Sequence, residues 1–299
     1  MEVNTLSEFR GILCLRRKQE QMGELRNMNE PWGKFCIQNL HRVKTRKEAT
    51  EAALKNKRYV RMLEMEWADD RKIDQVDNQL EESIIEELQP PSHLKDLTVK
   101  CYAGMHFPSW MNNSSISGLE SIRLHRCINL IPLPSVEHLS FLRTLEITSC
   151  SQMDELPCLP TALRNLILQD VSFSALPNNL HDLALQQLVI CQIPELWELP
   201  LLPITLKELT VDGVGVKAFP EFYLYHGLSA MTSRGGDSEG SSSRKPSLSI
   251  LKFHGCNHLT TLDEGLLRHK CRASWIVRSL YIGHRVKGSE LPFSPLRRS

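Results

Sequence analysis

The chain has 299 residues, and its 36 Lys and Arg against 35 Asp and Glu leave a formal net charge of +1. This balance excludes a global electrostatic attraction to nucleic acid or to a membrane, and the sequence shows neither an apolar run long enough to span a membrane nor a signal peptide. The nine cysteines are odd in number and form no Cys-x-x-Cys pair, which favours reduced thiols and an intracellular compartment. We expect a protein of the cytoplasm, with the nucleus as an open alternative.

Residues 1–31 are expected to form the N-terminal edge of a repeat array, where the apolar residues of 9–15 allow one strand. The array proper is expected over 32–220. A capping box of Thr45 and Glu48 predicts a helix early in it, because each side chain satisfies the other's free backbone N–H. The apolar residues that predict a strand on either side of this helix are Trp32/Phe35/Ile37 and Val60/Leu63/Met65.

A second helix is predicted over about 78–88, and Pro90-Pro91 ends it because a residue before proline is pushed out of the helical region. Its apolar face consists of Leu80, Ile84, Ile85 and Leu88. We expect its glutamates to form a solvated face: Glu81, Glu82, Glu86 and Glu87.

A frame of Leu-x-x-Leu-x-apolar recurs through the centre of the chain, and its middle leucines lie at 145, 166, 188 and 209. The steps of 21, 22 and 21 residues are typical of a leucine-rich repeat. The last two apolar positions alternate, so both side chains leave the same face of a strand. Stacked copies can bury that face as a parallel sheet. The sequence therefore predicts an α/β leucine-rich-repeat solenoid, with the sheet on the concave side and a helical or extended convex side.

After Pro220 the register breaks. Residues 221–247 are predicted to be a degenerate repeat with a mobile insertion rich in Ser and Gly over 229–247, because the next frame comes 42 residues after Leu209, twice the usual step. Terminal repeats and a frayed tail are expected over 248–299. Their frames are Leu248/Leu251/Phe253 and Val277/Leu280/Ile282.

The residues beside each buried pair should face out on the concave sheet. Near its middle, Ile167, Val189 and Cys191 place apolar groups outward on adjacent strands. Such a cluster can mark a protein contact, although strand propensity alone also favours Ile and Val there. The predicted protein-binding residues are Asn165, Ile167, Gln169, Gln187, Val189, Cys191, Glu208, Thr210 and Asp212.

No residue pattern nominates a catalytic or metal site. Cys127, Cys150 and Cys256 fall in the turn after the strand, where a packed thiol is expected. His254, Cys256 and His258 alternate, but no paired spacing of metal ligands recurs. We therefore expect no enzyme, no metal and no cofactor in this chain.

Several motifs are more specific than the leucine frame. Residues 23–31 (GELRNMNEP), 35–40 (FCIQNL), 47–57 (KEATEAALKNK) and 94–111 (LKDLTVKCYAGMHFPSWM) resemble the plant nucleotide-binding leucine-rich-repeat disease resistance proteins of the coiled-coil class. The resemblance implies a recognition region that acts in the defence response, binds a pathogen effector or a host protein, and restrains a nucleotide-binding switch domain. The sequence contains no Gly-x-x-x-x-Gly-Lys-Ser/Thr loop, so the ADP/ATP site of the family would lie in another domain. Glu64 and Glu66, near the N-terminal edge, are the expected switch-domain contact.

One alternative stays open: a free-standing leucine-rich-repeat scaffold or decoy that uses the same surface without a switch domain. In either case the expected partner is a protein, not nucleic acid.

Overall fold

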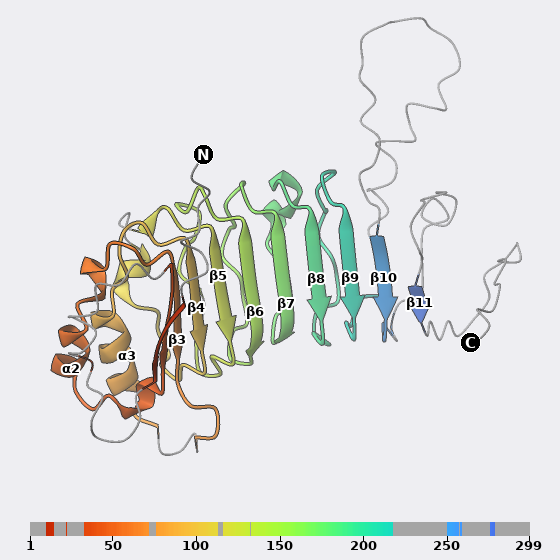
Figure 1. Cartoon of the computed structure of the whole chain (residues 1–299). Helices are drawn as coiled ribbons and strands as arrows, with labels where there is room; N and C mark the ends of the chain where they lie inside the picture. The colour runs from red at the N-terminus through yellow and green to blue at the C-terminus, as the bar shows by residue number, and fades with distance from the viewer. Residues whose placement is uncertain are drawn as a thin grey trace, which may run out of the picture.

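The structure, a computed structural model, describes residues 10–14, 22, 33–71, 76–112, 116–131, 133–217, 250–256, 258 and 276–278. Within these residues the chain forms one 11-stranded parallel sheet whose spatial order is the order of the sequence (Figure 1). The strands are β1 (Arg10–Cys14), β2 (Lys34–Gln38), β3 (Met62–Glu66), β4 (Asp96–Lys100), β5 (Ser121–His125), β6 (Thr144–Cys150), β7 (Asn165–Val171), β8 (Gln187–Cys191), β9 (Glu208–Asp212), β10 (Ile250–His254) and β11 (Ile276–Arg278).

The leucine frame sets the register of the central strands. Leu145 pairs with Leu166, Leu166 with Leu188, and Leu188 with Leu209. All four side chains are fully buried. Because side chains alternate along a strand, the residues between the buried positions lie on the other face of the sheet. The predicted solenoid with one parallel sheet is confirmed.

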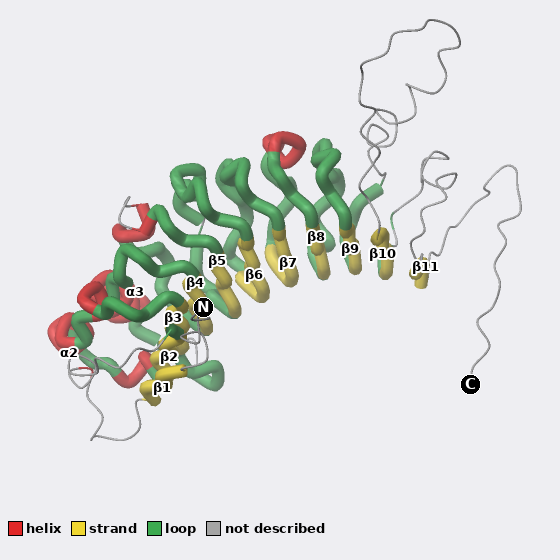
Figure 2. Tube along the Cα trace, turned by 45° about the horizontal axis from the view of Figure 1, so that its top comes forward, coloured by secondary structure: helices red, strands yellow, loops and turns green. Residues whose placement is uncertain are grey.

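The strands follow an arc, with the sheet on its inner side and the helices and loops on its outer side (Figure 2). Helices occur at the N-terminal end, in the coils that join β2 to β3 and β3 to β4, which are longer than those of the central strands: α2 (Arg46–Glu51) and α3 (Asn78–Glu87). Elsewhere the described backs of the coils are extended or 3₁₀, as in η7 (Asn178–Asp182), because a coil of about 21 residues leaves little length for a helix. The 10 residues of α3 make the longest described helix, so no helix in this part of the chain can cross a membrane.

The predicted capping box is half confirmed. The Thr45 side chain accepts the backbone N–H of Glu48 at 3.2 Å. The Glu48 carboxylate, however, accepts the N–H of Lys44 at 3.0 Å, one residue before the expected Thr45. At α3, Asp77 caps the helix by accepting the N–H of Leu80 at 2.9 Å.

The prediction that the α3 glutamates form a solvated face is wrong. Glu81 is buried, the other three are partly buried, and each accepts a hydrogen bond from a neighbouring coil. The reason is that α3 lies between two coils whose donors need acceptors. One coil supplies backbone N–H groups, and the other supplies the Thr50 hydroxyl and the Arg46 guanidinium. The contacts are Glu81 with Ala103 N–H (2.9 Å), Glu82 with Met105 N–H (2.8 Å), Glu86 with Ser109 N–H (2.7 Å) and Glu87 with Thr50 Oγ1 (2.9 Å).

A residue with positive φ lies next to the C-terminal end of each central strand and turns the chain away from the sheet. Gly213 and Gly255 occupy this position at φ of 62° and 61°, where glycine carries no side-chain penalty. The thiol expected next to the turn is confirmed in three coils: Cys127 Sγ lies 3.7 Å from Val99 O, Cys150 Sγ 3.5 Å from Thr148 O, and Cys256 Sγ 3.7 Å from Val211 O.

Two predictions near the C-terminus need correction. The extra repeat expected within 221–247 would place a strand between β9 and β10, but Leu209 pairs directly with Leu251. The 42-residue step is therefore one coil of the sheet, not two. The last described strand lies at Ile276–Arg278, where Val277 pairs with Phe253, whereas the predicted frame set Ile282 opposite Phe253. Residues 280 and 282 of that frame lie outside the described part of the chain. The Ser/Gly-rich insertion and the tail lie outside the described residues.

Candidate functional site

The nine residues predicted to bind protein lie together on three adjacent strands, β7, β8 and β9. The register places them in three rows across the sheet. The rows are Asn165, Gln187 and Glu208; Ile167, Val189 and Thr210; and Gln169, Cys191 and Asp212. We call this set the concave grid.

The centre of the concave grid is apolar and half-buried. Ile167 and Val189 are Cα partners on neighbouring strands, and Cys191 lies two residues further along the second strand. Their intermediate burial leaves part of each side chain available to a partner. None of the three belongs to the buried core behind the sheet.

Hydrogen bonds hold the polar rim of the concave grid. Gln187 Nε2 donates to Glu208 Oε2 at 2.9 Å, and Asn165 Nδ2 donates to Thr144 Oγ1 at 3.1 Å. Beyond the grid, β10 contributes Lys252, 3.4 Å from Glu208, and His254, whose Nδ1 lies 2.8 Å from Asp212 Oδ1. The rim is thus pre-ordered by cross-strand pairs, which lowers the entropy lost when a partner binds.

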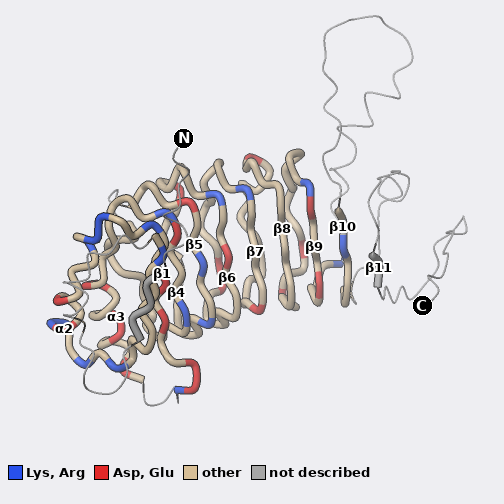
Figure 3. Tube along the Cα trace, viewed as in Figure 1, with Lys and Arg blue, Asp and Glu red and all other residues tan. Residues whose placement is uncertain are grey.

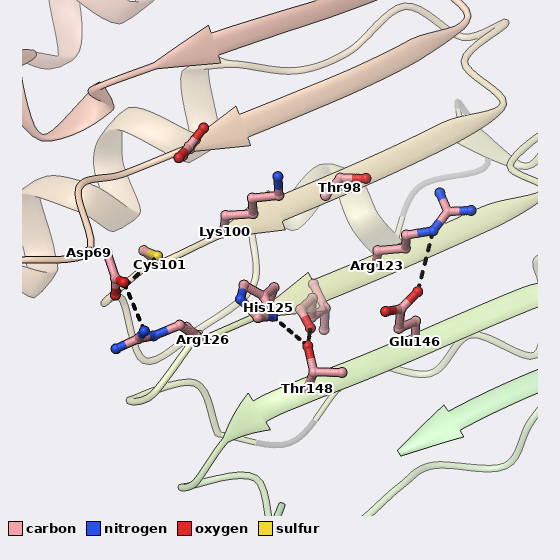
Figure 4. A pocket seen from close by; sticks show the side chains of 11 residues that line it. Asp69, Thr98, Lys100, Cys101, Arg123, His125, Arg126, Glu146 and Thr148 are labelled. Carbon is pink, nitrogen blue, oxygen red and sulfur yellow. Dashed lines mark hydrogen bonds and ion pairs between the residues drawn. The ribbon is translucent and has the colours of Figure 1, made fainter. Parts of the chain in front are cut away.

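A second feature of the concave face is a polar hollow of about 410 Å³ at the C-terminal ends of β4 to β6 (Figure 4). Its charges pair among themselves. Arg126 lies 2.8 Å from Asp69 and Arg123 Nε 3.5 Å from Glu146, while His125 Nδ1 lies 2.6 Å from Thr148 Oγ1. The hollow therefore presents no field of one sign.

Sequence reasoning placed the strand residues of the hollow outward but did not predict the hollow itself. Its wall depends on Asp69, Cys101 and Arg126, which lie in turns after the strands. Turn conformation is not set by the leucine frame, and the positive φ of Cys101 and Arg126 is visible only in the structure.

Two thiols on the concave face are poor nucleophiles. Burial, together with the negative charge of Asp69, raises the pKa of Cys101 to about 11. Burial and the carboxylate of Asp212 likewise raise the pKa of Cys191. Because the thiolate is the reactive form, both groups stay mostly protonated and react slowly near neutral pH.

The expected switch-domain contact is only partly available. Glu64 is 7% exposed and is paired with Lys34 at 3.1 Å and with Lys100. Glu66 is less buried and accepts a hydrogen bond from Gln38 Nε2 at 3.2 Å. Glu64 therefore belongs to an ion-pair network within the sheet, and Glu66 is the carboxylate that a partner could reach.

One group of potential metal ligands occurs near this network. Single ligand atoms of Cys36, Glu64 and Glu66 all lie within 4.8 Å of one another. Lys34 and Lys100 already neutralise Glu64, which leaves little negative charge to attract a cation. At the other end of the sheet, Cys256 turns its thiol toward Val211 O while His254 contacts Asp212, so these two do not converge on one point.

Replacing Glu64 with glutamine is expected to lower the free energy of unfolding by about 1.5–3 kcal/mol at neutral pH, the usual contribution of hydrogen bonds to a charged group. Burial would raise the pKa of Glu64, but hydrogen bonds from Lys100 and Lys34 outweigh it and hold the pKa below its ordinary value of 4.5. The stability that the ionised Glu64 carboxylate contributes is therefore complete above pH 4.5. It is lost as the pH falls through the lowered pKa of Glu64.

Urea unfolding at a series of pH values measures this difference. The matched control is Glu66→Gln, since its carboxylate is held by the neutral Gln38 amide. A stability difference between wild type and Glu64→Gln that persists undiminished in acid would contradict the assigned ion pairs.

Comparisons with known proteins show which proteins the repeat array is similar to. Residues 22–150 match the family model described as R13L1/DRL21 leucine-rich repeats. RGA1 of Solanum bulbocastanum, named as a disease resistance protein, is 34% identical over 179 residues, which are 57% of this chain and 18% of RGA1. Disease resistance protein RGA2 of the same species is 35% identical over 145 residues, 48% of this chain and 14% of RGA2.

A solved structure, the leucine-rich-repeat domain of the type III effector XCV3220 (XopL), aligns with a TM-score of 0.37 and 22% identity over 64% of this chain and 52% of that chain. The chain spans 18% and 14% of the lengths of the two plant relatives. Together with the repeat geometry, the family match and the plant relatives confirm the resemblance that the motifs indicated. The chain carries a leucine-rich-repeat region of the type found in plant nucleotide-binding leucine-rich-repeat disease resistance proteins.

Proposed function

We propose that this chain is the recognition region of an intracellular plant immune receptor, which binds a pathogen or host protein on its concave sheet and restrains a nucleotide-binding switch domain. The observation that carries the proposal is the concave grid: an apolar centre inside a polar rim, all on adjacent strands. Specific protein interfaces are commonly built in this way.

The region is proposed to act by binding, without catalysis and without a cofactor. The two protonated thiols and the self-paired charges of the hollow support this, because neither supplies an activated nucleophile. The sequence holds no phosphate-binding loop, so we place the ADP/ATP site of such a receptor in its switch domain.

Replacing Ile167 and Val189 together by lysine is expected to weaken partner binding by more than about tenfold, because an interface would have to bury two unpaired ammonium groups. The immobilised chain is exposed to extracts of healthy and infected plant tissue, and bound proteins are quantified by mass spectrometry. Neither residue supports the core, so the unfolding transition should stay close to that of the wild type.

The matched control is Leu201→Lys with Ile204→Lys, two apolar residues on the coil behind the sheet that are 43% and 53% exposed. This control should retain every partner that the wild type binds. A third variant, Glu66→Lys, tests the rival surface. If Glu66→Lys alone loses the bound proteins, the main partner is a switch domain and the concave proposal is wrong.

A further inference from the structure

Basic residues are concentrated in one coil, although the chain as a whole is nearly neutral. Residues 42–61 contain eight Lys or Arg and two Glu, a net charge of +6 within 20 residues. With a total of +1, the rest of the chain is net negative. The exposed members of this group form what we call the convex basic patch: Arg42, Lys44, Arg46, Lys47, Lys55, Arg58 and Arg61.

The coil that carries the patch lies on the outer side of the arc, at its N-terminal end. Figure 2 shows α2 as the outermost element there, and Figure 3 shows the basic residues around it. Ala49, Ala52 and Leu54 are buried against the core, so the opposite side of the coil is held outward. The patch is therefore a fixed, protruding surface, separate from the concave grid.

Acidic residues neutralise little of this charge. Arg46 pairs with Glu87 at 2.5 Å, the single ion pair that the patch makes among the described residues. Glu48 accepts the backbone N–H of Lys44, and its charge is already counted in the net +6 of the coil. Lys44 and Arg61 donate to backbone carbonyls, of His41 and His93, which satisfies their hydrogen bonds but leaves their charge uncompensated.

An aromatic side chain lies within the patch. Tyr59 follows Arg58 and is 52% exposed, and among the large hydrophobic side chains of the described residues only Phe141 and Ile204 are slightly more exposed. A tyrosine has an apolar ring and a polar hydroxyl, a combination that suits the boundary between lipid and water.

We propose that the convex basic patch docks the chain on an anionic phospholipid bilayer. Clusters of four to eight Lys and Arg attract acidic lipid headgroups, each cation contributing about fivefold to the partition coefficient. The coil that carries the patch protrudes at α2, so a planar surface can approach it from outside the arc (Figure 2). The polar hollow lies on the opposite, concave face, and none of the residues of the convex basic patch lines it. Docking on the convex side leaves the concave grid free for a protein partner.

Co-sedimentation with vesicles tests this proposal on the full chain. Vesicles of phosphatidylcholine mixed with phosphatidylserine should bind the wild type, and vesicles of phosphatidylcholine alone should not. The variant Lys47→Gln/Lys55→Gln/Arg58→Gln should lower the partition coefficient by about 100-fold, from the loss of three cations. Added salt should weaken wild-type binding, since it screens exposed charges.

The control is Arg143→Gln/Arg164→Gln/Lys207→Gln, which removes the same charge from exposed residues next to β6, β7 and β9. It should bind like the wild type, and unfolding curves should show that both triple variants remain folded. Equal losses in the two variants, or equal binding to both kinds of vesicle, would overturn the proposal. Binding of polyuridylic acid through the patch without binding to vesicles would also overturn it, because the partner would then be nucleic acid.

Discussion

Replacing Leu166 with aspartate is expected to remove more than about 4 kcal/mol from the free energy of unfolding, a large part of the roughly 5–15 kcal/mol that stabilises an ordinary domain. Leu166 is fully buried and pairs with Leu145 on one side and Leu188 on the other. The variant loses the burial of the leucine and places a carboxyl group where no partner exists for it. Because each coil of a solenoid is stabilised by its two neighbours, the damage extends to β6 and β8.

The adjacent residue provides the control. Asn165→Asp changes a half-buried side chain on the concave face and loses one hydrogen bond, to Thr144, so it should cost only about 0.5–1.5 kcal/mol. Thermal unfolding followed by circular dichroism compares the two variants. If Leu166→Asp melts like Asn165→Asp, the assignment of the leucine frame to the core is wrong.

Replacing Glu81 with alanine is expected to cost about 3–5 kcal/mol, the usual effect of removing one partner of a buried ion pair. Glu81 is 4% exposed, contacts Arg71 and accepts the N–H of Ala103 at 2.9 Å. Burial raises the pKa of Glu81 even though Ala103 and Arg71 lower it, so keeping the charge buried brings little net gain. The expected loss comes from the groups left behind: the Arg71 guanidinium loses its only carboxylate partner among the described residues, and the N–H of Ala103 loses its acceptor.

Glu81→Gln separates these contributions, since its amide oxygen can still accept the N–H of Ala103. It should be more stable than Glu81→Ala and less stable than the wild type in urea unfolding. Equal stability of Glu81→Ala and the wild type would show that α3 is not tied to the next coil in this way.

The leucine frame predicted the strands well because a buried residue every second position is required wherever one face of a sheet is covered. Leu145, Leu166, Leu188 and Leu209 therefore gave the register directly, and the outward positions of the concave grid followed from the alternation of side chains. Their role in binding a partner stays a prediction.

The contacts between coils could not be predicted in this way. Glu81 and Glu87 look alike on a helical face, yet one is buried against Arg71 and the other contacts Arg46 and Thr50. Which carboxylate is covered depends on how the loops of the neighbouring coils fold over α3. The prediction of an extra repeat within the 42-residue step was wrong for a related reason. An insertion and an extra repeat give the same sequence spacing, and only the pairing of Leu209 with Leu251 distinguishes them.

The rate of thiol alkylation at Cys191 tests the central claim most directly, because this residue lies in the concave grid itself. Cys158, exposed on the coil behind the sheet, serves as a reference within the same molecule. The chain is treated with N-ethylmaleimide at mildly alkaline pH, where more of the raised-pKa thiol is ionised, with and without a protein that it captured from plant extract. The two sites are followed by mass spectrometry. A partner on the concave grid should slow alkylation of Cys191 and leave that of Cys158 unchanged. An unchanged rate at Cys191 in the saturated complex would contradict recognition through this surface.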